Sequence, residues 1–133
     1  MVPLREELDF VKKYLDLEKE RFQERLDINI DVDKGILDEL IPPMLLQPLV
    51  ENSVKHGLST LIDGGTISIS IHKKEGKLAF EISDSGVGID NKENLFEKGV
   101  GLTNTRLRLE KMYQSTLRLS DNKPQGLKIN FEL

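Results

Sequence analysis

Hydrophobic residues recur at helical spacing over the first part of the chain. The stripe repeats about every seven positions, at Leu4, Leu8, Val11, Leu15 and Phe22. Phe10, Tyr14 and Leu17 widen it. The pattern predicts a helix of about twenty residues with one apolar face. Because nothing caps it upstream, we expect it to be the end of a longer helix.

Strict alternation of apolar and polar residues predicts strands in the rest of the chain. Ile28, Ile30 and Val32 alternate with polar residues, which predicts a short half-buried strand. Residues 67–71 and 78–82 alternate in the same way, and the polar stretch 73–77 between them predicts a hairpin. Two more strands are predicted at residues 116–119 and 127–133, on either side of the turn 123–126.

Two further helices are predicted between these strands. One follows Pro42-Pro43 and runs from about Met44 to His56, where Gly57 stops it. Pro48 lies inside it, so the helix either kinks there or begins near Gln47. The other runs from about Leu102 to Tyr113. The elements together predict an α+β fold, a two-layer α/β sandwich in which helices cover one face of a mixed sheet.

Composition narrows the class of protein. The chain has 133 residues, the size of one domain, with 19 basic and 23 acidic side chains and a net charge of −4. It has no cysteine, which excludes disulfides, thiolate metal sites and thiol nucleophiles. No stretch reaches the roughly 18 consecutive apolar residues that a spanning helix needs. The absence of a basic stripe argues against nucleic acid as the main partner.

Three polar segments carry candidate chemistry, and the first lies on the predicted helix 44–56. One side of this helix is apolar, with Leu46, Val50 and Val54. The other side carries a carboxylate, a carboxamide, an ammonium and an imidazole, on Glu51, Asn52, Lys55 and His56. Such a set could hold a metal ion and a polyanion. The alternative is an amphipathic helix that turns its polar side to water.

The other two segments are rich in glycine. Residues 84–89, Asp-Ser-Gly-Val-Gly-Ile, follow a predicted strand. Asp84 could accept a hydrogen bond from an exocyclic amine, and the glycines would let a planar base approach the backbone. Residues 99–106 open the last predicted helix, where backbone N–H groups and the helix dipole suit a phosphate. Each segment alone also fits an ordinary turn or a helix cap.

Several other sites are excluded. The chain has neither G-x-x-x-x-G-K-[ST] nor a G-x-G-x-x-G after the first strand of a βαβ unit. Zinc is not expected, because His56 and His72 are the only histidines and no cysteine accompanies them. We expect His72 to be an exposed surface residue. The string DINIDVDKG is not a calcium loop, because Val32 occupies the sixth position, where glycine is needed.

The three segments in this order resemble the GHKL ATP-binding domain, the Bergerat fold of gyrase, the Hsp90 chaperones, the mismatch-repair ATPase and histidine kinases. The N box, the G1 box and the G2 box of that family are similar to L-L-Q-P-L-V-E-N-S-V-K-H-G, D-S-G-V-G-I and G-V-G-L-T-N-T-R-L. The first of these, with the preceding E-L-D-F-V-K-K-Y-L-D-L-E-K-E-R-F, resembles sensor histidine kinases of the LytS type more closely still.

The resemblance implies a role for each matching residue. Asn52 would hold Mg²⁺ between the phosphates, and Glu51 would orient or deprotonate water or help the ion. Lys55 and His56 would meet the phosphates or the ribose. Asp84 would bind the adenine amine. The remaining contacts to the nucleotide would come from the two glycine-rich boxes, at Gly86, Gly88, Ile89, Gly99, Gly101, Leu102, Thr103, Asn104 and Arg106.

The resemblance also implies an activity. The chain would bind ATP and Mg²⁺ and transfer the γ-phosphoryl group to a histidine on a dimerisation domain, from which a response regulator would take it. Residues 1–25 would be the distal part of a dimerisation helix and 26–133 the catalytic domain. The family's H-F-x-F-N phosphoacceptor segment does not occur here. We expect a cytoplasmic domain of a homodimeric protein anchored in the membrane.

Two alternatives and two departures from the family pattern accompany this hypothesis. The alternatives are an ATP hydrolase with Glu51 as general base, and a nucleotide-sensing or inert interaction module. The first departure is a short lid, because only ten residues, 89–98, separate the two glycine boxes. The second is Gly126-Leu127-Lys128 in the last strand, where many relatives have Gly-Thr.

Overall fold

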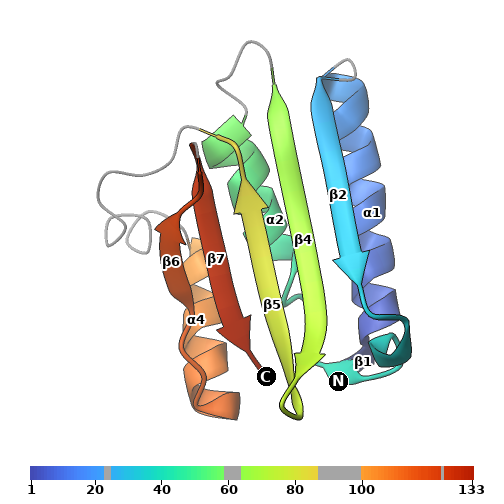
Figure 1. Ribbon diagram of the computed structural model, residues 1–133, viewed down its shortest axis with the longest axis vertical. Helices are drawn as coiled ribbons and strands as arrows, with labels where there is room; N and C mark the ends of the chain where they lie inside the picture. Colours follow the sequence, from blue (N-terminus) through green and yellow to red (C-terminus); the bar gives the residue numbers. More distant parts are fainter. Residues whose placement is uncertain (23–24, 59–63, 87–99, 124) are drawn as a thin grey trace.

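The computed structural model has two layers, a five-stranded sheet and a layer of helices on one of its faces (Figure 1). The structure describes residues 1–22, 25–58, 64–86, 100–123 and 125–133. This arrangement, with helices on one face of the sheet, confirms the fold class predicted from the alternation and helical patterns. In chain order the elements are β1 (Val2–Pro3), α1 (Leu4–Arg21), β2 (Leu26–Val32), a 3₁₀ turn (Lys34–Ile36), β3 (Leu40–Ile41), α2 (Gln47–Asn52), the π-helical turn η2 (Ser53–Leu58), β4 (Gly65–Lys74), β5 (Lys77–Asp84), α4 (Val100–Tyr113), β6 (Arg118–Asp121) and β7 (Leu127–Glu132).

The sheet has the order β2-β4-β5-β7-β6. β2 pairs with β4 in parallel and the other neighbours pair antiparallel, so the sheet is mixed. The parallel step from β2 to β4 needs a crossover, and α2 lies within it. β4 and β5 form the predicted hairpin, with the two-residue turn Glu75-Gly76, both at positive φ. β1 and β3 form a separate two-stranded pair that the alternation pattern did not predict.

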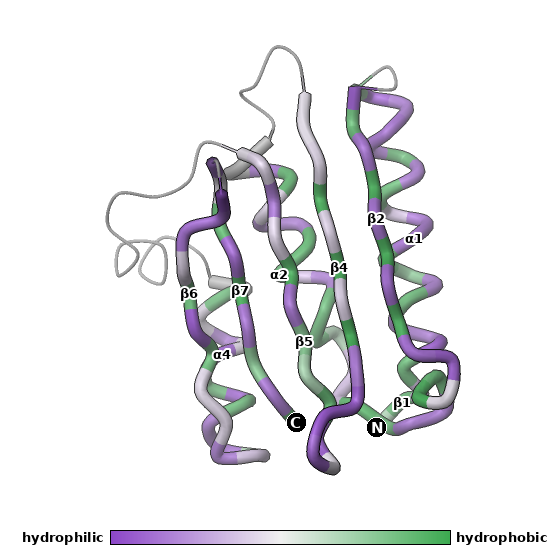
Figure 2. The backbone as a smooth tube through the Cα atoms, in the orientation of Figure 1, coloured by the Kyte–Doolittle hydropathy of each residue, from purple (hydrophilic) through white to green (hydrophobic). Residues whose placement is uncertain are grey.

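The core lies between the sheet and the helices (Figure 2). The α1 stripe predicted from sequence contributes its main members to this core: Leu4, Leu8, Val11, Leu15 and the neighbouring Phe22 are buried. This stripe therefore packs against the chain's own core. Phe10 and Leu17, expected to widen the stripe, are 57% and 67% exposed, so that part of the prediction was wrong. The role of residues 1–25 as a dimerisation helix stays a prediction.

The boundaries of several elements differ from those predicted. α2 begins at Gln47, one of the two alternatives, because Pro48 fits only the first turn of a helix. The helix does not stop at Gly57 but continues as a π-helical turn to Leu58. β6 begins two residues later than predicted, because Gln114 at φ 53 ends α4 and residues 114–117 connect the two elements.

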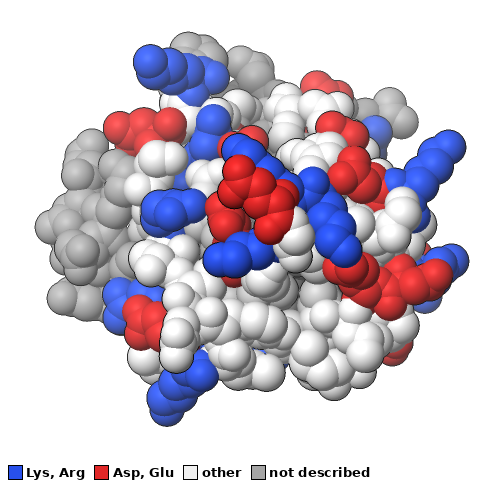
Figure 3. All heavy atoms as spheres, turned by 60° about the horizontal axis from the view of Figure 1, so that its bottom comes forward, with Lys and Arg blue, Asp and Glu red and all other residues white. Residues whose placement is uncertain are grey.

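Charged side chains of both signs are interspersed on the face of the molecule that Figure 3 shows. This agrees with the small net charge of −4 and with the absence of a basic stripe in the sequence. No helix in the ranges that the structure describes is long and apolar enough to cross a membrane.

His72 on β4 has a side chain that is 40% exposed, in line with the surface position that we expected, and it forms an ion pair with the end of the edge strand β2. Its Nδ1 lies 2.8 Å from Asp33 Oδ1, and its Nε2 lies 3.3 Å from Asp31 Oδ2. Next to it, Lys73 Nζ donates to Glu39 at 2.8 Å. The hydrogen bond with Asp33 raises the pKa of His72, and the same bond lowers the pKa of Asp33.

These shifts predict a pH-dependent stability. His72 stabilises the fold fully below its unfolded pKa of 6.5, and this contribution is lost as the pH rises through its higher folded pKa. Asp33 stabilises it above 3.8 and loses this contribution as the pH falls through its lower folded pKa. We expect urea unfolding of the parent chain to show a loss of stability as the pH rises above 6.5, and we expect His72→Asn to reduce this loss. His56, the other histidine, is present in both proteins, so a difference between them reports on His72. Equal pH profiles for the two proteins would contradict this assignment.

Candidate functional site

The polar segment on α2 and η2 is more buried than a water-facing helix would be. Asn52 is only 8% exposed, and Ser53 is also buried. Glu51 is half-buried, and its Oε1 accepts a hydrogen bond from Gln47 Nε2 at 3.2 Å. Lys55 is exposed, and the side chain of His56 lies outside the described residues. A solvated polar face would leave Asn52 in water, so its burial favours a binding role.

Asp84 ends β5 and is 2% exposed. Its Oδ1 accepts hydrogen bonds from the amides of Gly86 at 2.9 Å and Leu127 at 3.3 Å. Burial raises the pKa of Asp84, while these two hydrogen bonds act in the opposite direction. The Ser53 hydroxyl lies near enough to lower this pKa further, although it does not reach hydrogen-bonding geometry. Both amides meet Oδ1, so in the described part of the chain no backbone donor bonds Oδ2.

The turn before β7 holds Asp84 from its other side, which the sequence did not indicate. Asn122 Nδ2 donates to the Asp84 carbonyl oxygen at 2.9 Å. Gly126 has φ +115, and a Cβ built there would lie 1.8 Å from the same oxygen. Only glycine allows this approach. The contact from position 127 is a backbone amide, so the departure from the family's Gly-Thr pattern at Leu127 leaves this contact to Asp84 in place.

The third segment forms the start of α4. Leu102 is 1% exposed and belongs to the hydrophobic core, so it could meet a ligand only through its backbone. Thr103 and Arg106 are half-buried and Asn104 is exposed. Gly101 lies in the first turn of the helix. The other predicted positions of the glycine boxes, Gly88, Ile89 and Gly99, lie outside the described residues.

The described parts of the first two segments meet at one end of the sheet, and the helix that carries the third packs against α2. η2 contacts both β4 and β5, and α2 contacts α4. In Figure 1, β5 finishes beside α2 toward the upper end, and α4 begins nearer the middle of the molecule. The spacing of the three motifs in the sequence could not show this, because β4 and β5 separate the first two motifs and residues 87–99, outside the described residues, separate the last two.

Tyr14 of α1 lies close to the same end of α2. Burial raises its pKa to about 12, and the negative charges of Glu18 and Glu51 add to the effect. Its hydroxyl is buried and has no hydrogen-bond partner in the part of the chain that is described. From the sequence we expected Tyr14 only as part of the apolar stripe, and its spacing gave no sign of a buried hydroxyl near Glu51.

A metal ion at this end would find few protein ligands. The described residues contain no group of three His, Cys, Asp or Glu side chains that could hold one. Asn52, the predicted ligand, offers a carboxamide oxygen, which is a donor that Mg²⁺ accepts.

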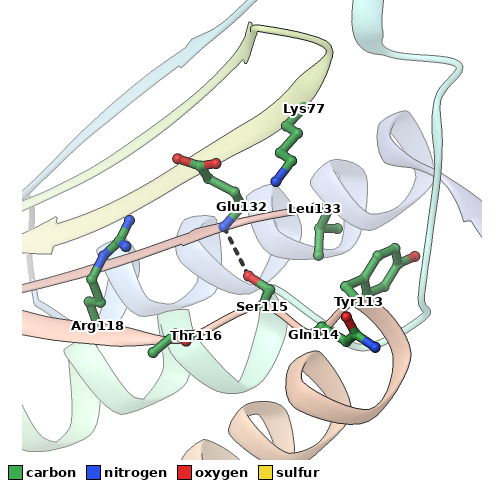
Figure 4. Close-up of a pocket in the computed structure, with 8 residues that line it drawn as sticks. All are labelled: Lys77, Tyr113, Gln114, Ser115, Thr116, Arg118, Glu132 and Leu133. Atoms are coloured by element: carbon green, nitrogen blue, oxygen red, sulfur yellow. Dashed lines mark hydrogen bonds between the residues drawn. The ribbon is translucent and has the colours of Figure 1, made fainter.

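A pocket of about 210 Å³ lies at the opposite end of the sheet (Figure 4). Its lining includes Lys77, Arg118 and Glu132, and Ser115 Oγ lies 3.4 Å from the Glu132 amide nitrogen. None of the predicted site residues lines it. Its charges are of both signs, so it does not match the polyanion site that the three motifs predict.

Comparison with known proteins decides the family. Residues 38–133 match the family described as "Histidine kinase-, DNA gyrase B-, and HSP90-like ATPase". The chain belongs to this family. It is the histidine kinase-type ATPase domain found in sensor kinases, and ATP binding follows from the family. The resemblance noted from the N, G1 and G2 boxes is thus confirmed.

Its relatives include named sensor kinases. The chain is 38% identical over 107 residues to the sensor histidine kinase BtsS of Escherichia coli K12, which covers 80% of this chain and 19% of BtsS. It is 40% identical over 92 residues to the sensor protein LytS of Oceanobacillus iheyensis, which covers 69% of this chain and 16% of LytS. The chain spans less than a quarter of the length of each of these relatives.

Solved structures confirm the fold. The catalytic domain of histidine kinase ThkA superposes with a TM-score of 0.77 at 18% identity, covering 98% of this chain and 92% of that one. The histidine kinase AdeS of Acinetobacter baumannii gives a TM-score of 0.72 at 18% identity, covering 99% of this chain and 64% of that one. In both comparisons α1 falls within the matched part, since almost the whole chain is covered.

Proposed function

We propose that this chain binds ATP with Mg²⁺ at the α2, β5 and α4 end and presents the γ-phosphoryl group to a histidine on a separate dimerisation domain. The observation that carries the proposal is the buried Asp84 carboxylate, whose Oδ1 is fixed by two backbone amides. A buried, oriented acceptor at the end of a strand suits the exocyclic amine of adenine. Asn52 lies on the adjoining helix, also buried.

The other residues of the site complete the proposal. Asn52 would ligate Mg²⁺, and Lys55 and His56 would contact the phosphates or the ribose. Gly86 and Gly88, with Ile89, would leave room for the adenine ring. Gly99 and the start of α4, with Gly101, Leu102, Thr103, Asn104 and Arg106, would close over the phosphates through backbone N–H groups. Bound ATP supplies the phosphoryl group, and the chain's own part is positioning and charge neutralisation.

The partners of the whole protein are also proposals. The phosphoacceptor would be a dimerisation domain of the same protein, with a response regulator as the next acceptor, in a homodimer anchored to the membrane. Support comes from the names of the relatives, two of which are a sensor histidine kinase and a sensor protein. Residues 1–25 would connect to that dimerisation domain, with α1 packed on the catalytic domain.

A second candidate function is ATP hydrolysis with Glu51 as general base. The hydrogen bond from Gln47 to Glu51 favours it, because a base must be held in one orientation. The two functions differ in where the phosphoryl group goes. Steady release of phosphate without an acceptor would favour the hydrolase.

A transfer experiment tests the proposal. The chain is incubated with γ-labelled ATP alone and with a fragment that carries an H-F-x-F-N helix from a similar kinase. We expect acid-labile label on the added fragment and none on the chain, because His72 lies on β4 in an ion pair with β2. Label on the chain itself, or phosphate release without transfer, would overturn the proposal.

Removing the Asn52 carboxamide should uncouple nucleotide binding from magnesium. We expect Asn52→Ala to bind an ATP analogue with nearly the same affinity with and without Mg²⁺, whereas the parent chain binds it more tightly with the ion. Calorimetry under both conditions gives the measurement. Asn29→Ala, at an exposed position on β2, serves as the control. A mutant that gains as much from Mg²⁺ as the parent would show that Asn52 is not the ligand.

A further inference from the structure

α2 begins without a side-chain cap of its own. None of its first residues caps the helix, and Pro48 has no amide hydrogen to satisfy. The amides of Leu49 and Val50 both bond to the Leu46 carbonyl. The backbone N–H groups that still need acceptors are those of the turn just before the helix, because a buried N–H group is costly without a hydrogen-bond partner.

Glu7 on α1 supplies those partners from far away in the sequence. It is 3% exposed. Its Oε1 accepts hydrogen bonds from the amides of Leu46 at 3.0 Å and Gln47 at 3.4 Å, and its Oε2 accepts one from Met44 at 3.2 Å. A buried carboxylate is costly unless it is hydrogen-bonded, and here both oxygens are. The start of the helix that carries Asn52 is thus fixed by α1.

Arg108 on α4 holds the same turn from the other side. Its Nη1 donates to the Met44 carbonyl at 3.1 Å and its Nη2 to the Pro43 carbonyl at 2.6 Å. Met44 has φ 58, so its backbone is in the left-handed region that residues with a side chain rarely adopt. The N–H of Met44 bonds to Glu7 and its C=O to Arg108.

We infer that Glu7, the turn 43–46 and Arg108 form a helix junction that sets the position of α2 relative to α4, and thereby the geometry of the nucleotide site. Glu7 and Arg108 are positioning residues in this inference, which rests on the proposed function for its nucleotide readout. Asn52 lies at the end of α2, and the predicted phosphate-binding residues lie at the start of α4. A shift at the junction would therefore move both walls of the site.

The junction is also linked to Glu51 through the hydrogen bonds of one residue, Gln47. The Gln47 amide bonds to Glu7, and the Gln47 side chain donates to Glu51 at 3.2 Å. Gln47 is thus in contact with the junction and with a candidate catalytic carboxylate at once. Loss of Glu7 would release both the helix start and the residue that orients Glu51.

The test measures variants at both sides of the junction. Glu7→Gln keeps one acceptor oxygen but places an NH₂ group against the backbone donors. Arg108→Ala removes both contacts to the turn, and Arg108→Lys keeps the charge with fewer donors. Glu6→Gln and Lys111→Ala, exposed on the same two helices, are the matched controls. Leu78→Ala lowers stability at the end of β5 opposite Asp84 and controls for a general loss of stability.

The first readout needs no ligand. In ¹H–¹⁵N spectra of the free protein we expect Glu7→Gln and Arg108→Ala to shift the amide signals of Asn52 and Ser53, and the three controls to leave them in place. Shifts confined to residues 43–48 would overturn the inference, whether or not the chain binds ATP. If the parent chain bound no adenine nucleotide, the proposed function would fail, and these spectra would still decide the role of the junction.

The second readout is affinity for an ATP analogue with Mg²⁺. We expect Glu7→Gln and Arg108→Ala to weaken it by roughly two- to thirtyfold while the proteins remain folded, since coupling through such networks is typically of that size. Arg108→Lys should recover part of the loss. In the double variant the two losses should not multiply, because both act on the Met44 peptide. If Leu78→Ala lost as much stability as the junction variants and also lost as much nucleotide affinity, the role of the junction would be purely structural. That result would overturn the inference.

Discussion

Asp84→Asn should weaken binding of an ATP analogue by roughly ten- to a hundredfold, because it leaves a polar contact worth about 1–3 kcal/mol unpaired. The amide oxygen can still accept from Gly86 and Leu127, so the fold should persist. The NH₂ group would then take the place of Oδ2 and face the adenine amine, donor against donor. Calorimetry gives the affinity, and far-UV circular dichroism checks the fold.

The pH dependence of the same measurement adds a second test. Burial raises the pKa of Asp84 above 3.8. As the pH is lowered, the affinity of the parent chain should therefore begin to fall at a higher pH than it would if Asp84 had the pKa of an ordinary aspartate. Asp84→Asn should lack this dependence. Asp27→Asn, exposed on β2, is the control and should behave as the parent does. Unchanged affinity in a folded Asp84→Asn protein would show that another residue reads the base.

Local patterns predicted the parts of the fold that depend on local residues. Alternation at residues 67–71 and 78–82 indicated the hairpin because each strand buries one face, and β4 and β5 do so. The position of Asp84 at a strand end followed from the same pattern. The α1 stripe was read correctly as an apolar face, but periodicity does not say what covers it, and in the structure the chain's own core does.

Contacts between distant residues could not be predicted in this way. Glu7 lies 39 positions before Leu46, and in the sequence it is one acidic residue among several on an amphipathic helix. Arg108 is 64 positions from Met44. The π-helical turn after Asn52 also changes the rotation per residue, so the two sides expected for a regular α-helix no longer describe where Lys55 lies. The one signal available in the sequence was the spacing of Glu7, three residues after Leu4 and four before Val11, which places a carboxylate on the apolar stripe of the helix.

Gly126→Ala should have the largest effect on both stability and binding. A Cβ at this position would lie 1.8 Å from the Asp84 carbonyl oxygen and 2.7 Å from its carbon, and backbone atoms cannot rotate away as a flexible side chain would. At φ +115 the residue also adopts a conformation that is costly for alanine. We expect a loss of about 3–5 kcal/mol in the free energy of unfolding, since strain and overpacking add at a buried site.

The affinity loss in Gly126→Ala has a specific cause. To relieve the clash, the start of β7 must move away from the end of β5, which breaks the Leu127 hydrogen bond to Asp84 Oδ1 and frees the carboxylate that we propose binds the adenine amine. Two control variants separate the backbone strain from the steric clash. Gly35→Ala has neither a positive φ nor a neighbour within 4 Å and should be neutral, while Gly76→Ala has φ +81 in open space and shows the cost of strain alone. Urea unfolding gives the loss of stability and calorimetry gives the nucleotide affinity. If Gly126→Ala lost no more stability than Gly76→Ala and kept its nucleotide affinity, the close approach of β7 to Asp84 would have no role in the site.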